Sequence, residues 1–355
     1  MWFGTRIYLW VVVLIAGWAT VSSSGLTGYA ELWNRWDSRW FESIATEGYI
    51  GTYVSDFEDF RYNTAFFPGF PALVRGGIAL GLNPTIAGML ISLVAGFAAV
   101  LAIGRLVRQV GGDPRWGALA WVVAPTAVFL SAAYTEALFA AFAFWAWTLA
   151  KDGRWWWVAL LAGLAGFVRP NGMFLAAALV VLVLTTRPFR WQHLLAAVAP
   201  LVSTAVFFYY LWTLTGNWNA WSQAHEDFWG RQVVDPITSL VNSYNLIFTF
   251  SPTGEPSSRF VTEILAMVVL VVVIVITARK KWWGEATYTL LTAVSLGTSS
   301  MYYSIPRTLV LVFPLWVLLG LWLGRSTWRR WAYVIVFLPA LTLVTIRFTQ
   351  NQWIS

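Results

Sequence analysis

The sequence predicts an all-α membrane protein with many transmembrane helices, and three observations support this fold class. Of the 355 residues, 59% are hydrophobic and only 11% are charged, whereas a soluble domain has about 25% charged residues. Apolar runs of about 20 residues, the length that a helix needs to cross a bilayer, recur along the whole chain. The runs lack the short alternating pattern of membrane β-barrel strands. No polar stretch is long enough for a separate soluble domain, so we expect a single domain over residues 1–355.

The apolar runs predict eleven spanning helices. In chain order they cover residues 7–24, 84–104, 116–133, 135–150, 155–168, 171–186, 192–214, 260–278, 284–301, 308–324 and 331–348. We expect 7–24 to be the first span and not a cleaved signal, because its apolar core is long and its exit lacks a clear A-x-A site. A further apolar segment, 66–82, begins with F-F-P-G-F-P and contains Arg75. Both features disfavour a spanning helix.

The charges predict how these helices are oriented. If 66–82 does not span, one side of the membrane receives most of the basic residues. They are Arg6, Arg105, Arg108, Arg115, Lys151, Arg154, Arg187, Arg190, Arg279, Lys280, Lys281, Arg325, Arg329 and Arg330. Only Asp113, Asp152 and Glu285 are acidic on that side. Lys and Arg concentrate in cytoplasmic loops. We therefore predict a multi-pass protein of the cell membrane with its N-terminus inside, its C-terminus outside, and 66–82 lying on or dipping into the outer leaflet.

The residue content excludes several kinds of site. The chain has no cysteine, which excludes disulfides, thiolate nucleophiles and Cys-based metal sites. Its two histidines, His193 and His225, lie far apart in the sequence, which disfavours a His-built metal site. No nucleotide-binding or metalloprotease motif is present, and we expect neither a metal nor a cofactor. The net charge of +7 does not indicate nucleic-acid binding, because basic cytoplasmic loops explain it.

Polar connections that are not basic gather on the predicted outer face. They are the segments 25–65, 134–136, 169–171, 215–259 and 302–307. Separate connections that converge on one surface are typical of a site. We therefore predict that the outer loops 25–83 and 215–259, with interfacial helices in the first of them, form the active face.

Asp37 is the first candidate residue, in the segment W-D-S-R-W-F-E that follows the first span. One interpretation is a helix N-cap, for which Asp is a favoured residue. The other is that the apolar residues that follow, such as Trp40, Phe41 and Ile44, lie along the membrane surface. Asp37 would then be held at the interface, where a carboxylate can act as general base on a hydroxyl.

Arg169, Arg231 and Arg307 lie at junctions between apolar spans and outer segments, where the positive-inside tendency does not explain them. A guanidinium is always charged and offers a planar fork of donors, which suits a lipid phosphate. The alternatives are an ion pair with an outer carboxylate such as Glu136, or snorkelling to the interface. Together the three arginines favour a phosphate.

The remaining candidates each keep two interpretations. Glu136 lies just inside a span, which makes it a functional candidate, but a role as partner of Arg169 explains it equally well. The segment 215–232 mixes aromatic and amide side chains, which suit either a sugar or an interfacial belt. His225 is either a second base or a hydrogen-bonding residue, and the second role is the more common for a lone histidine.

Six segments in order resemble the PIG-V family, which comprises the second mannosyltransferase of GPI-anchor assembly and its bacterial homologues. They are W-D-S-R-W-F-E-S-I-A-T-E-G-Y (36–49), N-T-A-F-F-P-G-F-P-A-L-V-R (63–75), P-T-A-V-F-L-S-A-A-Y-T-E-A-L-F (125–139), R-P-N-G (169–172), F-W-G-R (228–231) and I-P-R-T-L-V-L-V-F-P-L (305–315). The family pattern has R-Y near the last segment, where this chain has Arg307-Thr308.

The resemblance implies a GT-C glycosyltransferase. Such an enzyme transfers mannose, with inversion, from a polyprenyl-phosphate-mannose donor at the outer or lumenal face; here a bacterial cell-envelope glycolipid or glycan acceptor fits best. By motif match, Asp37 is the general base and the three outer arginines hold the donor phosphate. The residues expected to contact substrate are Trp36, Glu42, Glu136, Asn171, His225 and Trp229.

Two other function classes stay open at this point. A lipid or glycolipid transporter or flippase is one, although such proteins commonly show inverted repeats and ionisable groups near mid-membrane, and we find no such repeat. A non-catalytic scaffold subunit is the other. Within the enzyme class, the sugar can be arabinose or glucose, and the acceptor a glycolipid, a polysaccharide or a protein hydroxyl. The expected partners are thus a donor lipid, an acceptor and membrane lipids, with no nucleic acid.

Overall fold

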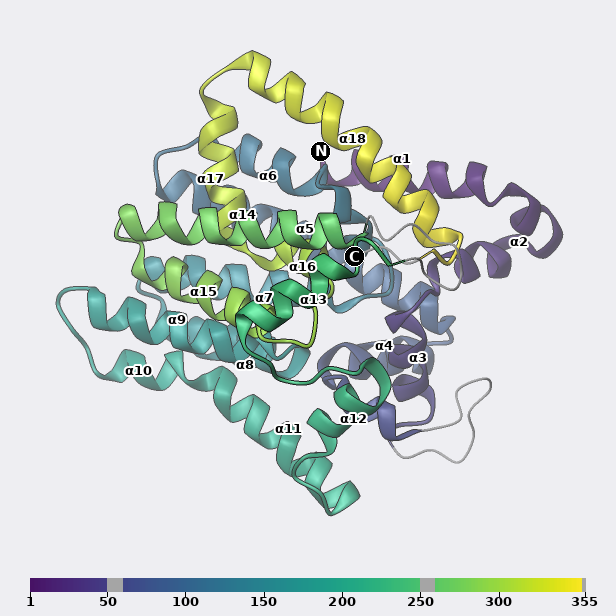
Figure 1. The fold of residues 1–355 in the computed structure, drawn as a ribbon, viewed down its shortest axis with the longest axis horizontal. Helices are drawn as coiled ribbons and strands as arrows, with labels where there is room; N and C mark the ends of the chain where they lie inside the picture. The colour runs from purple at the N-terminus through teal and green to yellow at the C-terminus, as the bar shows by residue number, and fades with distance from the viewer. Residues whose placement is uncertain (50–59, 250–258, 353–355) are drawn as a thin grey trace.

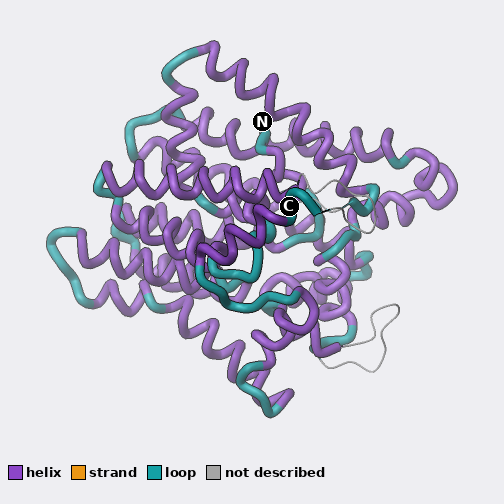
Figure 2. Tube along the Cα trace, in the orientation of Figure 1, coloured by secondary structure: helices purple, strands orange, loops and turns teal. Residues whose placement is uncertain are grey.

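A computed structural model describes residues 1–49, 60–249 and 259–352. In these ranges the chain is a bundle of helices without a strand, apart from one isolated bridge between Val233 and Ser299 (Figure 2). The α-helices are α1 Trp2–Ala16, α2 Trp18–Trp33, α3 Asp37–Thr46, α4 Gly69–Ala79, α5 Pro84–Gln109, α6 Pro114–Val122, α7 Thr135–Lys151, α8 Trp155–Val168, α9 Asn171–Thr185, α10 Gln192–Ala197, α11 Ala199–Thr215, α12 Ala220–Trp229, α13 Pro236–Asn245, α14 Arg259–Arg279, α15 Trp283–Gly297, α16 Ile305–Thr308, α17 Phe313–Gly324 and α18 Thr327–Thr349. The 3₁₀ segments are η1 Phe60–Ala65, η2 Pro125–Leu130 and η3 Leu309–Leu311.

Several of the predicted spans coincide with helices that are long and apolar enough to cross a bilayer. Three described helices, α5, α14 and α18, are each long and apolar enough to cross a bilayer, and the bent pair that ends in α17 makes a fourth candidate. Further apolar helices, such as α8 and α9, are shorter than a straight span requires. The helices are those of a multi-pass membrane protein, while the count of eleven spans stays a prediction.

Three predicted spans are broken in the structure, each near a proline. The segment 116–133 divides into α6 and η2 at Pro125, and 308–324 bends by 76° ahead of α17, close to Pro314. The segment 192–214 divides into α10 and α11 just before Pro200. Proline lacks a backbone N–H and its ring clashes with the preceding turn, so it kinks or breaks a helix; the helix is broken at these three positions, whereas α18 continues through Pro339. The prediction of unbroken helices was therefore wrong here.

The N-terminal segment turns back on itself. The predicted first span, 7–24, is also not one continuous helix: α1 and α2 are separated at Gly17, and the helical path of α2 is interrupted at Gly25, where φ is 61°. The returning part of α2 lies against α1, since the Tyr29 hydroxyl donates to the Trp10 carbonyl at 3.0 Å. This hairpin projects at the right of Figure 1 and delivers the chain to α3.

α4 accounts for the ambiguous segment 66–82. The helix is 11 residues long and too short to span a bilayer by itself. Arg75 Nε donates to the Ala45 carbonyl of α3 at 2.8 Å, so its guanidinium ties α4 to α3. The parts 50–59 and 250–258 of the two predicted outer loops lie outside the described residues.

α7 forms the centre of the bundle. It is apolar on all sides, and most of its residues are buried between neighbouring helices (Figure 1), as expected of a core helix. Arg6, predicted among the cytoplasmic basic residues, has no exposed surface and lies inside the bundle, so its charge is not that of an exposed loop.

Candidate active site

Two consecutive helices bring the first pair of charges together. Glu136 lies in the first turn of α7, and Arg169 directly follows the last residue of α8. α7 and α8 pack side by side and run in opposite directions (Figure 1), so the start of one lies beside the end of the other. Arg169 Nη1 donates to Glu136 Oε1 at 2.8 Å and to Thr135 Oγ1 at 2.6 Å. The ion pair with Glu136, one of the interpretations of Arg169, is therefore present.

Arg307 joins this pair to Asp37. Its Nε donates to Glu136 Oε1 at 2.5 Å, and its Nη1 donates to Asp37 Oδ2 at 2.5 Å. Asp37, Glu136, Arg169 and Arg307, which we call the ionic cluster, come from α3, α7, the end of α8 and α16. The structure thus brings together four predicted site residues that are distant in the sequence.

The segment that carries Arg307 is held from several sides. The Glu263 carboxylate of α14 accepts hydrogen bonds from the backbone N–H groups of Ser304 and Ile305, both at 2.8 Å. These are N-terminal donors of α16, which need such an acceptor. The Arg307 guanidinium carbon lies 4.9 Å from the ring of Phe129 and 4.6 Å from that of Tyr134.

The two carboxylates of the cluster differ in exposure. The Glu136 side chain has no exposed surface, whereas that of Asp37 is 20% exposed. Asp37 is the first residue of α3, and its side chain makes no capping bond, so the N-cap interpretation does not describe its role in the structure. In the described part of the chain, Asp37 Oδ1 has no hydrogen-bond partner. It remains available as a proton acceptor.

Arg231 has a different environment from the other two arginines. Its guanidinium carbon lies 5.1 Å from the ring of Tyr303, and Nε is buried with no hydrogen-bond partner in the described ranges. None of the ion pairs found among the described residues includes Arg231, although Asp37 is close enough to act on it electrostatically. Burial lowers the pKa of Arg231.

His225 lies among aromatic rings on α12. Its ring centroid is 4.4 Å from that of Trp221 and 5.5 Å from that of Trp229. Nδ1 lies 2.9 Å from the Trp221 carbonyl, which can only accept, so Nδ1 carries the proton and Nε2 the lone pair. Burial lowers the pKa of His225 to about 4. The residue is therefore neutral near pH 7 and a weak base.

Three more residues were predicted to contact substrate, and each has partners on neighbouring segments. Glu42 accepts from Asn34 Nδ2 at 2.6 Å, and burial raises the pKa of its carboxyl. Asn171 begins α9, and its Oδ1 lies 3.5 Å from Arg169 Nε. The Trp229 ring lies 6.5 Å from that of Trp40 on α3.

Trp36 immediately precedes α3, with a positive φ of 53°. A left-handed conformation is uncommon for a bulky residue, and it turns the chain so that Asp37 starts the helix.

Several residues of the site were not predicted from the sequence. Tyr134 and Thr135 stand next to Glu136 in a quoted segment, so their neighbourhood was the available signal. Tyr303 likewise lies within the predicted outer segment 302–307. Glu263 gave no usable signal, because it is an isolated acid in a predicted apolar span and acts on a segment about 40 residues further along the chain.

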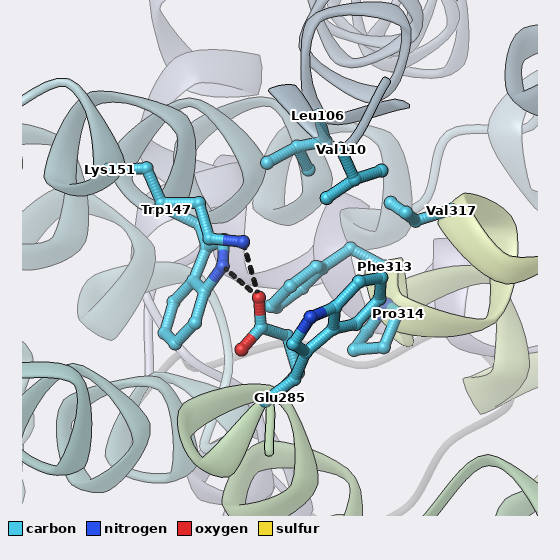
Figure 3. Close-up of a pocket in the computed structure, with 9 residues that line it drawn as sticks. Leu106, Val110, Trp147, Lys151, Glu285, Phe313, Pro314 and Val317 are labelled. Atoms are coloured by element: carbon cyan, nitrogen blue, oxygen red, sulfur yellow. Dashed lines mark hydrogen bonds and ion pairs between the residues drawn. The ribbon is translucent and has the colours of Figure 1, made fainter. Parts of the chain in front are cut away.

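A second ion pair, partly buried, lies at the opposite end of α7. Lys151 Nζ lies 2.6 Å from Glu285 Oε1, and Trp147 Nε1 donates to the same oxygen at 3.3 Å (Figure 3). The small cavity around this pair has otherwise apolar lining residues, including Leu106 and Phe313. None of the predicted site residues lines it.

No group of three or more His, Cys, Asp or Glu side chains suited to hold a metal ion occurs in the ranges that the structure describes. The ionic cluster itself has two carboxylates, both engaged by arginine.

Comparisons with known proteins find a matching family profile and several similar proteins. The profile of the family described as Mannosyltransferase (PIG-V) matches residues 19–211, more than half of the chain. The mouse protein named GPI alpha-1,6-mannosyltransferase 2 is 35% identical over 153 residues, and the human protein of that name is 33% identical over 153 residues. Each match covers 39% of this chain and 29% of the relative. The chain therefore matches less than a third of the length of these curated relatives.

A solved structure is similar over nearly the whole chain. It is the crystal structure of ArnT from Cupriavidus metallidurans bound to undecaprenyl phosphate, with a TM-score of 0.55 and 16% sequence identity. The similarity covers 94% of this chain and 62% of that one. At this identity it shows the fold alone, which is the GT-C fold of membrane glycosyltransferases.

Proposed function

The chain belongs to the PIG-V family of mannosyltransferases, and we propose that it transfers mannose from a polyprenyl-phosphate-mannose donor to a hydroxyl of a lipid-linked or cell-envelope glycan. The family and the GT-C fold support a glycosyltransferase role. The neighbour of similar fold binds undecaprenyl phosphate, which supports a lipid-phosphate carrier. The donor, the acceptor and the outer location of the site belong to the proposal.

The observation that carries the proposal is the ionic cluster, with its one partly exposed carboxylate. In the reaction that we propose, the acceptor oxygen forms a bond to the anomeric carbon while the bond from that carbon to the phosphate oxygen breaks. The polyprenyl phosphate leaves with the electron pair, and the acceptor proton goes to Asp37 Oδ1. Attack from the side opposite the leaving group inverts the anomeric configuration. A positioned base of this kind contributes about 10² to 10⁴ in rate.

The exposures of Asp37 and Glu136 favour different roles for the two carboxylates. A general base must come within hydrogen-bond reach of the proton that it removes. Asp37 is 20% exposed and keeps one oxygen without a partner in the described structure, whereas Glu136 is fully buried and accepts from two arginines. We therefore infer that Asp37 is the base and that Glu136 anchors Arg169 and Arg307.

Arg307 orients the base. It donates from Nη1 to Asp37 Oδ2, while its Nε is held by the fully buried Glu136. This arrangement directs the other oxygen, Oδ1, away from the arginine. A base oriented by a second, anchored group is the general design of an activated proton acceptor.

The charges of the site favour a phosphodiester. Asp37 and Glu136 carry two negative charges, and Arg169, Arg231 and Arg307 carry three positive ones, which leaves one positive charge in excess. A sugar phosphodiester carries one negative charge. Arg231 is the arginine outside the ion pairs of the described residues, so its guanidinium is the best placed to take the phosphate without breaking another pair.

The remaining donors of the cluster complete a phosphate site. Arg169 and Arg307 each use Nη1 and Nε in the hydrogen bonds described above, and Nη2 of each makes none with the described residues. These groups can stabilise the charge that develops on the leaving phosphate.

A transfer assay with defined donors tests the function. Purified protein in detergent is incubated with a total lipid and glycan extract and with radiolabelled polyprenyl-phosphate-mannose, polyprenyl-phosphate-glucose or GDP-mannose. We expect label to enter a new product from the first donor alone. Transfer from GDP-mannose would contradict the lipid-linked donor. Movement of intact labelled lipid across proteoliposome membranes without any new product would favour the transporter alternative.

A further inference from the structure

Arg6 is a buried cation without an acidic partner among the described residues. It lies in α1 with no exposed surface, and none of the ion pairs among the described residues includes it. Its guanidinium carbon lies 4.4 Å from the centre of the Trp2 ring. Burying an arginine is costly unless its donors are satisfied, so what satisfies this one indicates what it does.

Nε of Arg6 donates to Thr5 Oγ1 on its own helix at 3.4 Å, and its other three acceptors lie on both sides of one helix break. Nη2 donates to the carbonyl of Val122, the last residue of α6, at 3.1 Å. Nη1 donates to the carbonyl of Ala127 in η2 at 2.9 Å and to Ser131 Oγ, just after η2, at 2.8 Å. Carbonyls at the end of a helix lack intrahelical partners and carry partial negative charge. Arg6 therefore bridges the break that Pro125 creates.

The bridged segment supports the candidate active site directly. Thr126 Oγ1 donates to the carbonyl of Pro306, next to Arg307, at 3.1 Å. The Phe129 ring lies 4.9 Å from the Arg307 guanidinium carbon. The same stretch then leads through Tyr134, which lies against Arg307 and donates to the Arg35 carbonyl at 2.8 Å, into Glu136.

We propose that Arg6 is a positioning residue for the candidate active site: by bridging α6 and η2, it fixes the surface on which Arg307 lies. Arg6 reaches three oxygen atoms around the break in different directions, which the guanidinium fork can do and a single ammonium cannot do with the same geometry. The effect on transfer rests on the proposed function. The effect on the η2 segment does not.

Hydrogen exchange of the full-length protein in detergent tests the structural part. In Arg6→Met and Arg6→Lys, we expect faster exchange over residues 123–137 and 303–311, with no change over α14. The matched control is Tyr333→Phe, which removes a buried hydrogen bond from the Tyr333 hydroxyl to the Ala120 carbonyl of α6 without touching the break. It should leave 123–137 unchanged.

The opposite results overturn the proposal. They are unchanged exchange over 123–137, or an equal increase throughout the chain, which would mark Arg6 as a general stability residue. If both Arg6 variants fail to fold, exchange is measured in Ser131→Ala, which removes one of the three bonds from Arg6 to the break, and the same increase over 123–137 is expected. If it leaves exchange over 123–137 unchanged, the proposal is wrong.

Kinetics test the functional part once the wild type transfers sugar. We expect Arg6→Met to lower kcat by about 10-fold to 100-fold, as small misplacements of reacting groups do, with less change in the donor KM. In a double-mutant cycle with Phe129→Leu, the two losses should be clearly less than additive because both act on Arg307. Additive losses would overturn the positioning role. An inactive wild type would instead refute the proposed donor or function and leave the exchange result standing.

Discussion

The arginines of the site have the same chemistry but different partners, and this determines what each can do. Arg169 and Arg307 share Glu136, and Arg307 also holds Asp37. Breaking a buried pair of this kind by removing one partner costs about 3 to 5 kcal/mol, so both arginines stabilise the fold. Arg231 stacks on Tyr303 without such a pair in the described structure.

Substitution of Arg231 should therefore affect the donor more than the fold. We expect Arg231→Ala to raise the donor KM by about 10-fold or more, since a charge-assisted hydrogen bond to phosphate contributes about 1.5 to 3 kcal/mol, with little change in melting temperature. Steady-state kinetics at varied donor concentration measure this. The matched control is Arg115→Ala, an exposed arginine at the other end of the bundle. An equal change in KM for both variants would refute the phosphate role.

His225 predicts a dependence of stability on pH. Its pKa is about 4 in the folded protein, against an ordinary value of 6.5. Between these values the unfolded chain binds more protons, so folding becomes less stable as the pH falls through this range. We expect the melting temperature to drop less between pH 7 and pH 5 in His225→Gln than in the wild type. Parallel curves for the two proteins would show that His225 is not held neutral by burial.

The sequence predicted individual site residues better than their pairing. Asp37, Glu136, Arg169 and Arg307 were each found because a charge next to an apolar span needs an explanation. Their arrangement could not be predicted, because it depends on which helix ends meet in space. The exposure difference between Asp37 and Glu136 is likewise a property of packing. The burial of Arg6 was not predicted either, because the positive-inside tendency describes loops and this residue lies within a helix.

At the scale of the elements, proline-induced breaks bring backbone and side chains into the site. The 3₁₀ helix η2 and the short helix α16, which lies ahead of the bend before α17, are both inside the bundle: Phe129 of η2 contacts Arg307, and α16 carries it. Irregular backbone inside a membrane protein is tolerated where protein buries it. The prolines themselves were visible in the sequence, but hydropathy alone favoured continuous spans. The starts of α5, α7 and α8, by contrast, were predicted at the observed residues, where Pro84 and polar residues interrupt the apolar runs.

Close packing of α8 sets the position of Arg169. A Cβ atom on Gly166 would lie 2.6 Å from the Pro200 carbonyl oxygen and 2.8 Å from the Pro200 Cα, whereas one on Gly163 would have its nearest neighbour, Ser203 Oγ, at 3.6 Å. Gly166 therefore permits a backbone contact between α8 and α11 that Gly163 does not require.

Two substitutions one turn apart on this helix test that contact. We expect Gly166→Ala to destabilise the protein by about 1 to 3 kcal/mol through overpacking, and Gly163→Ala to be neutral or stabilising because Ala favours a helix by about 1 kcal/mol. Thermal unfolding in detergent compares them, and Gly166→Ala should also reduce transfer by displacing Arg169. Similar melting temperatures for the two variants would contradict the close contact.

At the scale of the whole molecule, the two ends of the bundle are chemically different. One end carries the ionic cluster, Arg231 and the aromatic helix α12. The other carries the Lys151–Glu285 pair and the pair of Arg105 with Asp152 at 2.7 Å. Basic residues predominate at this second end, which supports the prediction that it faces the cytoplasm.

The orientation can be tested directly because the chain has no cysteine. Ser222 is exposed on α12, and Thr186 is exposed just beyond the far end of α9. In intact cells, a membrane-impermeant maleimide should label Ser222→Cys. Thr186→Cys should be labelled only after permeabilisation. The reverse pattern would place the candidate active site in the cytoplasm and would contradict the proposed outer location.

The most direct test of the central claim is the transfer rate of Asp37→Asn with polyprenyl-phosphate-mannose, measured together with donor binding and melting temperature. The amide oxygen can still accept from Arg307, so the fold and donor affinity should be close to those of the wild type. We predict that transfer falls by about 10² to 10⁴ because the proton acceptor is lost. Transfer at the wild-type rate by this folded variant would show that Asp37 is not the base.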